Sequence, residues 1–404
     1  MGHSSRRPLR GPLTLAAALA VLLAACSSAS SVSSSPSSSS TAKPGAASGT
    51  LTAAMSSGAI DTMDPNRWYF AVTWGLANAM CTTLVRYADQ PGAAGTQLIA
   101  GTANMPAISS DGLTYTFTLR PGARFSNGTP ITGQDIKYTF MRLMNPAVDT
   151  GTGYYFTNVA GAPAYLAGKS TTVSGIVATT STVTFHLTAP DGAFLYKAAL
   201  PTTCPVPSGT PMKPQESGAL ETNDASGPYK LQSYQPGRQI VMVFNSNYDQ
   251  ALGVRGHVAK FVFNIGVQAS QAALEIQAGQ LDFQTSNLAT ADIIRISHDA
   301  ALASQVHQSP RPETTYLFLN NEVAPFNNVD VRKAVNYAIN RTAIEEQWGG
   351  PLVGSVTSEI MVPGALGYAP YSAYPDAPDL TQAKALMTAS GVKLPITTSL
   401  RTQN

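Results

Sequence analysis

The sequence has few charged residues. Asp, Glu, Lys and Arg make up 12% of its 404 residues, about half the usual share, so Ser, Thr, Asn, Gln and Gly must supply most of the polar surface. The formal net charge is only +2, and Arg6, Arg7 and Arg10 all lie at the extreme N-terminus. The rest of the chain therefore has no excess of basic residues, which argues against nucleic acid as a partner.

The sequence also lacks the usual catalytic and metal-binding patterns. Its five histidines are scattered and form no short-spaced ligand set. The Gly-Lys-Ser at 168–170 is not a P-loop, because Pro163 stands where that loop requires glycine. No G-x-S-x-G motif is present. We therefore expect no enzyme activity, no cofactor and no metal. The enzyme alternative, a secreted surface hydrolase, would need a nucleophile–base pair or a metal set.

The N-terminus is typical of a signal peptide, which we place at residues 1–25. A basic stretch, MGHSSRRPLRG, precedes an apolar run that is too short to span a bilayer well. The run ends in Leu23-Ala24-Ala25-Cys26, which resembles the bacterial lipobox, in which the cysteine becomes the first mature residue and carries lipid. We expect lipidation of Cys26; the alternative is an ordinary signal peptide with an incidental cysteine. Export by the Sec or the Tat route stays open.

Residues 26–49 are rich in serine and contain almost nothing to bury, so they predict a flexible tether. A lipid on Cys26 would hold the protein by this tether at the outer face of the cytoplasmic membrane. Cys81 and Cys204 are the two remaining cysteines. In an oxidising compartment such a pair is expected to form a disulfide. Two buried free thiols are the alternative.

The folded part mixes strands and helices, which predicts an α/β protein with mixed sheets and no internal repeats. Alternating or β-branched stretches predict strands at 49–55, 113–120, 258–266 and 314–320, and hairpins at 173–190 and 227–248. Helical spacing of apolar residues predicts helices within 69–88, 192–200 and 269–283, another near 290–300, and the longest at 327–348. The face expected to be buried on that longest helix comprises Val331, Ala334, Val335, Ala338, Ile339 and Ile344.

The stretch FSNGTPITGQDIKYTFMRLM, residues 125–144, is predicted to be scaffold and not active site. Asn127-Gly128 is a turn dipeptide. Thr132 and Asp135 have the spacing of a capping box at the start of a helix. The helix then carries one apolar stripe, with Lys137 expected to point to solvent; the stripe is Ile136, Phe140, Leu143 and Met144.

Four segments together resemble the extracellular solute-binding proteins of family 5, the peptide- and nickel-type receptors of ABC importers. They are MDPNRWYFAVTWGLANAMCTTLVRY, SSDGLTYTFTLRPGARFSNGTPITGQDIKYTFMRL, GPYKLQSYQPGRQIVMVFNSNY and PFNNVDVRKAVNYAINRTAI. The second and fourth segments are the specific ones. The resemblance runs in order from about residue 50 to the last residue.

The resemblance implies a class II periplasmic-binding-protein-like fold with two lobes and an extra accessory domain. Residues 50–78 and 195–313 would form the first lobe, residues 79–194 the accessory domain, and residues 314–404 the start of the second lobe. Family members continue well beyond the point that corresponds to Asn404, so we expect the second lobe to be incomplete. Cys81 and Cys204 would each lie near a crossing between the first lobe and the accessory domain.

The function that the resemblance implies is that of a monomeric substrate-binding lipoprotein, which captures an oligopeptide or similar solute and delivers it to an ABC permease and its ATPase subunits. The alternatives are the hydrolase above and a truncated remnant that binds nothing. The identity of the solute is not given by the sequence, and we expect residues 27–404 alone to bind weakly or not at all.

Four residues are candidates for ligand contact. Trp68 and Tyr69 follow the Asp64-Pro65 turn, where family members line the cleft. Tyr316 and Asn320 lie where the chain would enter the second lobe. A binding cleft needs aromatic walls and a few polar groups, which these residues supply. The alternative for Trp68 and Tyr69 is a place in the hydrophobic core.

Overall fold

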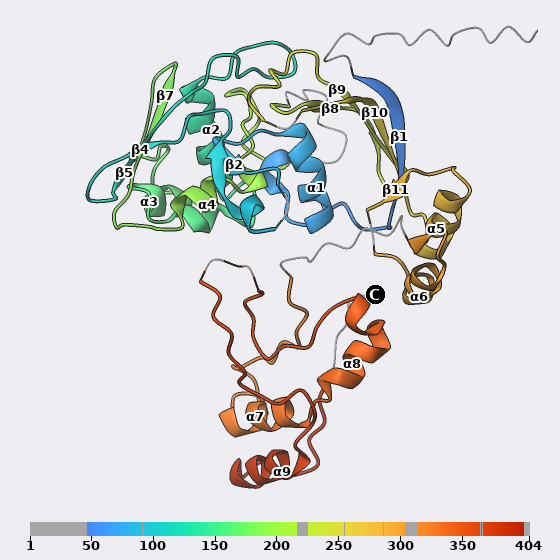
Figure 1. Cartoon of the computed structure of the whole chain (residues 1–404). Helices are drawn as coiled ribbons and strands as arrows, with labels where there is room; N and C mark the ends of the chain where they lie inside the picture. Colours follow the sequence, from blue (N-terminus) through green and yellow to red (C-terminus); the bar gives the residue numbers. More distant parts are fainter. Residues whose placement is uncertain are drawn as a thin grey trace, which may run out of the picture. The chain divides into compact units, whose positions relative to one another are not determined.

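The computed structural model describes residues 47–90, 92–215, 225–253, 255–285, 287–303, 313–363, 365 and 367–399 (Figure 1). The expected signal peptide, Cys26 and nearly all of the expected tether lie outside the described residues. The described chain begins with strand β1 (Ser48–Met55). The predicted strand at 49–55 is confirmed, and Ser48, expected in the tether, also belongs to it.

One sheet has five strands in the order β11-β1-β10-β9-β8. Besides β1 it contains β8 (Tyr229–Gln235), β9 (Gln239–Phe244), β10 (Val258–Ile265) and β11 (Phe283–Gln284). Strand β1 runs parallel to both of its neighbours, whereas β10, β9 and β8 are successively antiparallel. The predicted hairpin at 227–248 and the mixed character of the sheet are confirmed.

A second sheet has four antiparallel strands in the order β4-β5-β7-β6. They are β4 (Ala107–Ile108), β5 (Thr114–Thr118), β6 (Ile176–Ala178) and β7 (Thr182–His186). The alternation expected for 113–120 is present, because Tyr115 and Phe117 are buried and Thr118 is exposed. This confirms the predicted strand and the predicted hairpin at 173–190.

Helix α2 (Gly133–Met144) begins at the predicted capping box. The Thr132 N–H donates to Oδ2 of Asp135 at 2.9 Å, and the Asp135 N–H donates to Oγ1 of Thr132 at 3.3 Å. All four residues of the predicted stripe are buried, and Phe140 packs on Phe185 of β7 with ring centroids 4.7 Å apart. Lys137 was expected to point to solvent, but it is half-buried. The aliphatic stem of a lysine is often buried while its charged end stays in water.

The remaining regular elements are short. Strands β2 (Val85–Tyr87) and β3 (Leu98–Ala100) form a two-stranded ladder. The other α-helices are α1 (Ala71–Met80), α3 (Ala162–Leu166), α4 (Phe194–Ala198), α5 (Ala269–Gln277), α6 (Thr290–His298), α7 (Val329–Ala338), α8 (Arg341–Trp348) and α9 (Leu380–Ala389). The 3₁₀ turns η1 (Pro65–Arg67), η2 (Gly92–Thr96), η3 (Gly153–Phe156), η4 (Pro201–Thr203) and η7 (Gly350–Leu352) lie between them. Within the described ranges, no helix combines the length and apolar character needed to cross a bilayer.

Two predictions for residues 314–348 are wrong. The single helix expected at 327–348 is two helices, because the side chain of Asn340 accepts from the Ala343 N–H and starts α8 anew. Of the face expected to be buried, only Val331 and Ala334 are buried, while Ile344 is 48% exposed. Val335 and Ile339 are half-buried, and Ala338 is exposed.

Residues 314–320 do not form the predicted strand. A strand needs a hydrogen-bonded neighbour, and in the described residues these seven have no ladder to any other segment. Three of their large side chains, Tyr316, Leu317 and Phe318, stay exposed to solvent, and Phe318 is 77% exposed. The segment has the composition of a strand, but composition alone cannot supply a hydrogen-bonded neighbour.

Two separate hydrophobic clusters hold most of the buried side chains. The first cluster packs against the four-stranded sheet. It consists of residues between 84 and 199 together with Tyr248 and Leu252. The second lies on the five-stranded sheet and includes Trp68, Met80 and Phe263. Chain segments before and after residues 84–199 thus share one core, while the intervening segment has its own.

Candidate ligand-binding site

The turn η1, which precedes Trp68 and Tyr69, is fixed by a fully buried ion pair. Asp64 and Arg142 are both 0% exposed, and the guanidinium grips the carboxylate with both terminal nitrogens, at 2.8 and 2.7 Å. The same carboxylate accepts the N–H of Asn66, inside η1, at 3.2 Å. Bidentate pairing of this kind fixes geometry as well as charge.

Every N–H of the Arg142 guanidinium has an acceptor. Besides its two bonds to Asp64, it donates to Oδ1 of Asn66 at 2.9 Å, and to the carbonyl oxygens of Pro211 and Lys213, both at 2.9 Å. A buried charge is tolerated when all its hydrogen-bonding groups are satisfied. Arg142 therefore ties α2, η1 and the 211–213 segment into one rigid unit.

The two cysteines lie beside this unit. The structure joins Cys81 to Cys204 in a disulfide, with their Cα atoms 5.6 Å apart. The side-chain amide of Asn66 donates to the carbonyl of Cys204 at 3.1 Å. The pairing that we expected from the sequence thus has suitable geometry, and we keep it as a prediction to be tested chemically.

Trp68 is buried and Tyr69 is exposed. Trp68 is 2% exposed within the second hydrophobic cluster, and its Nε1 has no hydrogen-bond partner in the described part of the chain. This burial agrees with the core alternative that we kept for Trp68. Tyr69 is 60% exposed, so its ring is free to meet a ligand.

Asp61 holds the backbone of Tyr69 in place. Its Oδ2 accepts the N–H groups of Tyr69 at 2.6 Å and of Phe70 at 3.0 Å, and its Oδ1 accepts the Thr73 hydroxyl at 2.6 Å. These groups lie at the N-terminus of α1, where a carboxylate is stabilised by free N–H groups and the helix dipole. The sequence did not single out Asp61, because it lies eight residues before the amide that it binds.

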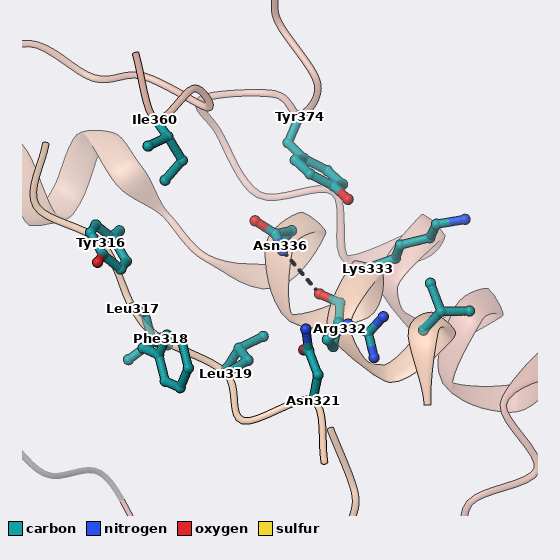
Figure 2. Close-up of a pocket in the computed structure, with 11 residues that line it drawn as sticks. Tyr316, Leu317, Phe318, Leu319, Asn321, Arg332, Lys333, Asn336, Ile360 and Tyr374 are labelled. Atoms are coloured by element: carbon teal, nitrogen blue, oxygen red, sulfur yellow. Dashed lines mark hydrogen bonds between the residues drawn. The ribbon is translucent and has the colours of Figure 1, made fainter. Parts of the chain in front are cut away.

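Tyr316 lines a pocket of about 480 Å³ between the extended segment 316–321 and helix α7 (Figure 2). The lining residues are Tyr316, Leu317, Phe318, Leu319, Asn321, Val329, Arg332, Lys333, Asn336, Ile360 and Tyr374. Asn320, Trp68 and Tyr69 are not among them. The Asn320 side chain instead accepts the Glu322 N–H at 3.0 Å. Of the four candidate residues, Tyr316 is the one that lines this pocket.

The pocket has two chemically different sides. Figure 2 shows segment 316–319, with its aromatic and aliphatic side chains, on one side of the pocket and the polar residues of α7 on the other. Asn336 is oriented there by donating to the Arg332 carbonyl at 3.0 Å. Arg332 and Lys333 are cationic, and no carboxylate belongs to the lining. Such a pocket suits a ligand with an apolar part and a negatively charged or polar end.

A second aromatic pair was missed in the sequence analysis. Tyr154 and Tyr155, in η3, have ring centroids 4.4 Å apart. A hydrogen bond with Tyr154, together with burial and the nearby hydroxyls of Tyr154 and Tyr69, raises the pKa of Tyr155 to about 12. The adjacent tyrosines in the sequence TGTGYYF were the available signal. Across the described residues there is no cluster of three or more His, Cys, Asp or Glu side chains arranged for a metal ion.

The fold is that of the periplasmic oligopeptide-binding proteins. The solved structure of clavulanic acid biosynthesis oligopeptide binding protein 2 superimposes with a TM-score of 0.72 at 27% identity, over 85% of this chain and 64% of that chain. The Escherichia coli murein tripeptide binding protein MppA gives a TM-score of 0.71 at 23% identity, over 86% of this chain and 67% of that chain.

The chain belongs to the bacterial extracellular solute-binding proteins, family 5, whose family model (Middle) matches residues 97–404. The probable D,D-dipeptide-binding periplasmic protein DdpA of E. coli K12 is 28% identical over 69% of this chain and 50% of its own. The nickel-binding periplasmic protein of the same strain is 28% identical over 73% of this chain and 53% of its own. The oligopeptide-binding protein OppA of Bacillus subtilis 168 is 27% identical over 60% and 45%. The chain thus spans about half the length of these relatives.

Proposed function

We propose that this protein is the substrate-binding component of an ABC importer, and that it binds an oligopeptide or similar solute without transforming it. The observation that carries the proposal is membership of a family of solute-binding proteins. Exposed aromatic groups on a fixed backbone give the proposal a physical basis: Tyr69 is held by Asp61, and Tyr316 lines a pocket. Neither a cofactor nor a metal is required, and the partners would be the permease and its ATPase subunits.

The roles of the four candidate residues follow from their exposure. Tyr69 and Tyr316 are 60% and 64% exposed and would contact the ligand directly. Trp68 is buried and precedes Tyr69 in the sequence, so it would support the position of Tyr69 without contacting the ligand. Asn320 lies next to the pocket residue Asn321 and would reach the ligand only if segment 316–321 shifts.

The cellular context is also a proposal. A lipid on Cys26 would anchor the protein to the outer face of the cytoplasmic membrane, and the serine-rich tether would let the folded part reach the permease. The protein would act as a monomer, with no nucleic acid partner. We also retain the division into a first lobe (50–78 and 195–313), an accessory domain (79–194) and the start of a second lobe (314–404). The two separate hydrophobic clusters support this division.

Titration calorimetry tests the proposal. Residues 27–404 are mixed with synthetic tripeptides up to millimolar concentration, and the sample is afterwards analysed by mass spectrometry. We expect weak, saturable heat that falls when Tyr69 is replaced by Ala, with every peptide recovered intact. Tyr371→Ala is the matched control, because Tyr371 is 69% exposed, close to the 60% of Tyr69, but lies outside the proposed contacts. Absence of any heat would favour a non-binding remnant, and cleaved peptide would favour a hydrolase.

A further inference from the structure

Exposed aromatic side chains from two separate segments, residues 69–70 and 154–155, lie near one another in the described structure. Tyr69 and Phe70 precede α1 and are 60% and 47% exposed, and Tyr154 of η3 is 60% exposed. Tyr155, whose ring contacts that of Tyr154, is partly buried against the first hydrophobic cluster. Soluble proteins rarely expose contiguous apolar groups of this size unless the patch contacts a ligand or partner.

Two segments far apart in the sequence make this aromatic surface. Nε of Arg67 donates to the Asp149 carbonyl at 3.1 Å, which ties the segment before Tyr69 to the segment before Tyr154. A Cβ placed on Gly151 would lie 4.0 Å from Cδ2 of Tyr69. The influence of the Tyr69 hydroxyl on the pKa of Tyr155 agrees with this closeness.

The backbone under the rings is held firmly. Asp61 binds both the Tyr69 and the Phe70 N–H groups. In the other segment, Asp149 and Gly151 have φ angles of 53° and 68°. Left-handed conformations in non-glycine residues are uncommon and persist where the surrounding structure fixes them. Exposed rings on a fixed backbone lose little entropy when they bind, which favours recognition.

We propose that Tyr69, Phe70 and Tyr154, backed by Tyr155, form a recognition surface for an aromatic side chain of the bound peptide. This inference rests on the proposed function and adds the chemical class that the site prefers. Aromatic rings attract one another in offset or edge-to-face arrangements beyond the area that they bury, and tilted rings such as those of Tyr154 and Tyr155, 56° apart, offer both faces and edges. An aliphatic side chain would gain only the free energy of burying its apolar surface.

Saturation-transfer difference NMR measures this preference and detects weak binding. The probes are the tripeptides Ala-Phe-Ala, Ala-Leu-Ala and Ala-Lys-Ala, each titrated into residues 27–404. We expect Ala-Phe-Ala to bind about three- to tenfold more tightly than Ala-Leu-Ala. Tyr154→Leu should remove that difference by weakening Ala-Phe-Ala binding more than Ala-Leu-Ala binding, and Tyr371→Ala should change the affinity for neither peptide. Unfolding curves for each variant ensure that the comparison uses folded protein.

The outcomes separate the two proposals. Equal binding of Ala-Phe-Ala and Ala-Leu-Ala, or a preference that survives Tyr154→Leu, would overturn the aromatic surface and leave peptide binding intact. Preferential binding of Ala-Lys-Ala would overturn it in favour of a cation held over the tyrosine faces. If none of the tripeptides binds at millimolar concentration, both proposals fail for residues 27–404, and the alternative of a non-binding remnant holds for them.

Discussion

Replacing Arg142 by Met should test whether the buried ion pair fixes the turn that carries the candidate site. The substitution keeps an apolar stem of similar length but leaves the Asp64 carboxylate 0% exposed with only backbone donors. It also strips the carbonyls of Pro211 and Lys213 of their guanidinium donor. Breaking a buried pair by removing one partner costs about 3–5 kcal/mol. A loss of that size is a large fraction of the stability of a typical domain.

A double-mutant cycle isolates the pair itself. Asp64→Asn keeps the shape of the side chain and removes its charge, so it should also cost about 3–5 kcal/mol by leaving the guanidinium unpaired. In the double variant neither charge is buried. Its loss of unfolding free energy should be smaller than the sum of the losses of the two single variants by about 1–3 kcal/mol. Urea unfolding followed by far-UV circular dichroism gives these free energies from the midpoint and slope.

Arg295→Met is the matched control. Arg295 pairs with Asp292 at 3.0 Å, but its side chain is 44% exposed, and exposed pairs contribute about 0–1 kcal/mol. The reasoning would be refuted if Arg142→Met cost no more than Arg295→Met. Strict additivity of the two single costs in the double variant would also refute it, because the two groups would then not interact.

Three further predictions concern the cysteines and Trp68. Cys81 and Cys204 should be recovered as one cross-linked peptide in non-reducing mass mapping, and reduction should lower stability by about 2–4 kcal/mol; two free thiols would rule the bridge out. Cys26→Ser should leave the protein unprocessed or release it into the medium, and a mature-sized, membrane-bound variant would contradict lipidation. Trp68→Ala should cost about 3–5 kcal/mol, as for a buried aromatic residue, and it should weaken tripeptide binding; if only stability changes in thermal unfolding and calorimetry, Trp68 belongs to the core alone.

Local signals in the sequence were sufficient where neighbours along the chain decide the structure. The Thr132–Asp135 capping box and the apolar stripe of α2 are contacts within a few residues, and both are present. The hairpin around Gly237 is equally local. The break at Asn340 was missed because helical spacing continues across it, and only the cap formed with the Ala343 N–H reveals the new start.

The candidate site was harder to predict because distant segments build it. Tyr69 could be singled out from its sequence context, but Tyr154 becomes its neighbour through tertiary contacts such as Arg67 with the Asp149 carbonyl. Trp68 is buried because its side chain packs into the second hydrophobic cluster, whereas the adjacent Tyr69 is not part of that cluster. This difference depends on tertiary packing. Residue type alone could not distinguish their roles.

The inner position of β1 in its sheet has a consequence for biosynthesis. Although β1 is made early, it lies between β10 and β11, and the Thr52 N–H donates to a carboxylate oxygen of Asp282, 230 residues later. At about 5–20 residues per second on the ribosome, β1 must wait roughly ten seconds or more for its partners. Most of the core under the four-stranded sheet comes from residues 84–199 and can assemble meanwhile. A chain that folds while it is being made would therefore pass through a half-assembled form in which β1 is unpaired, and a holding chaperone would have this strand to bind.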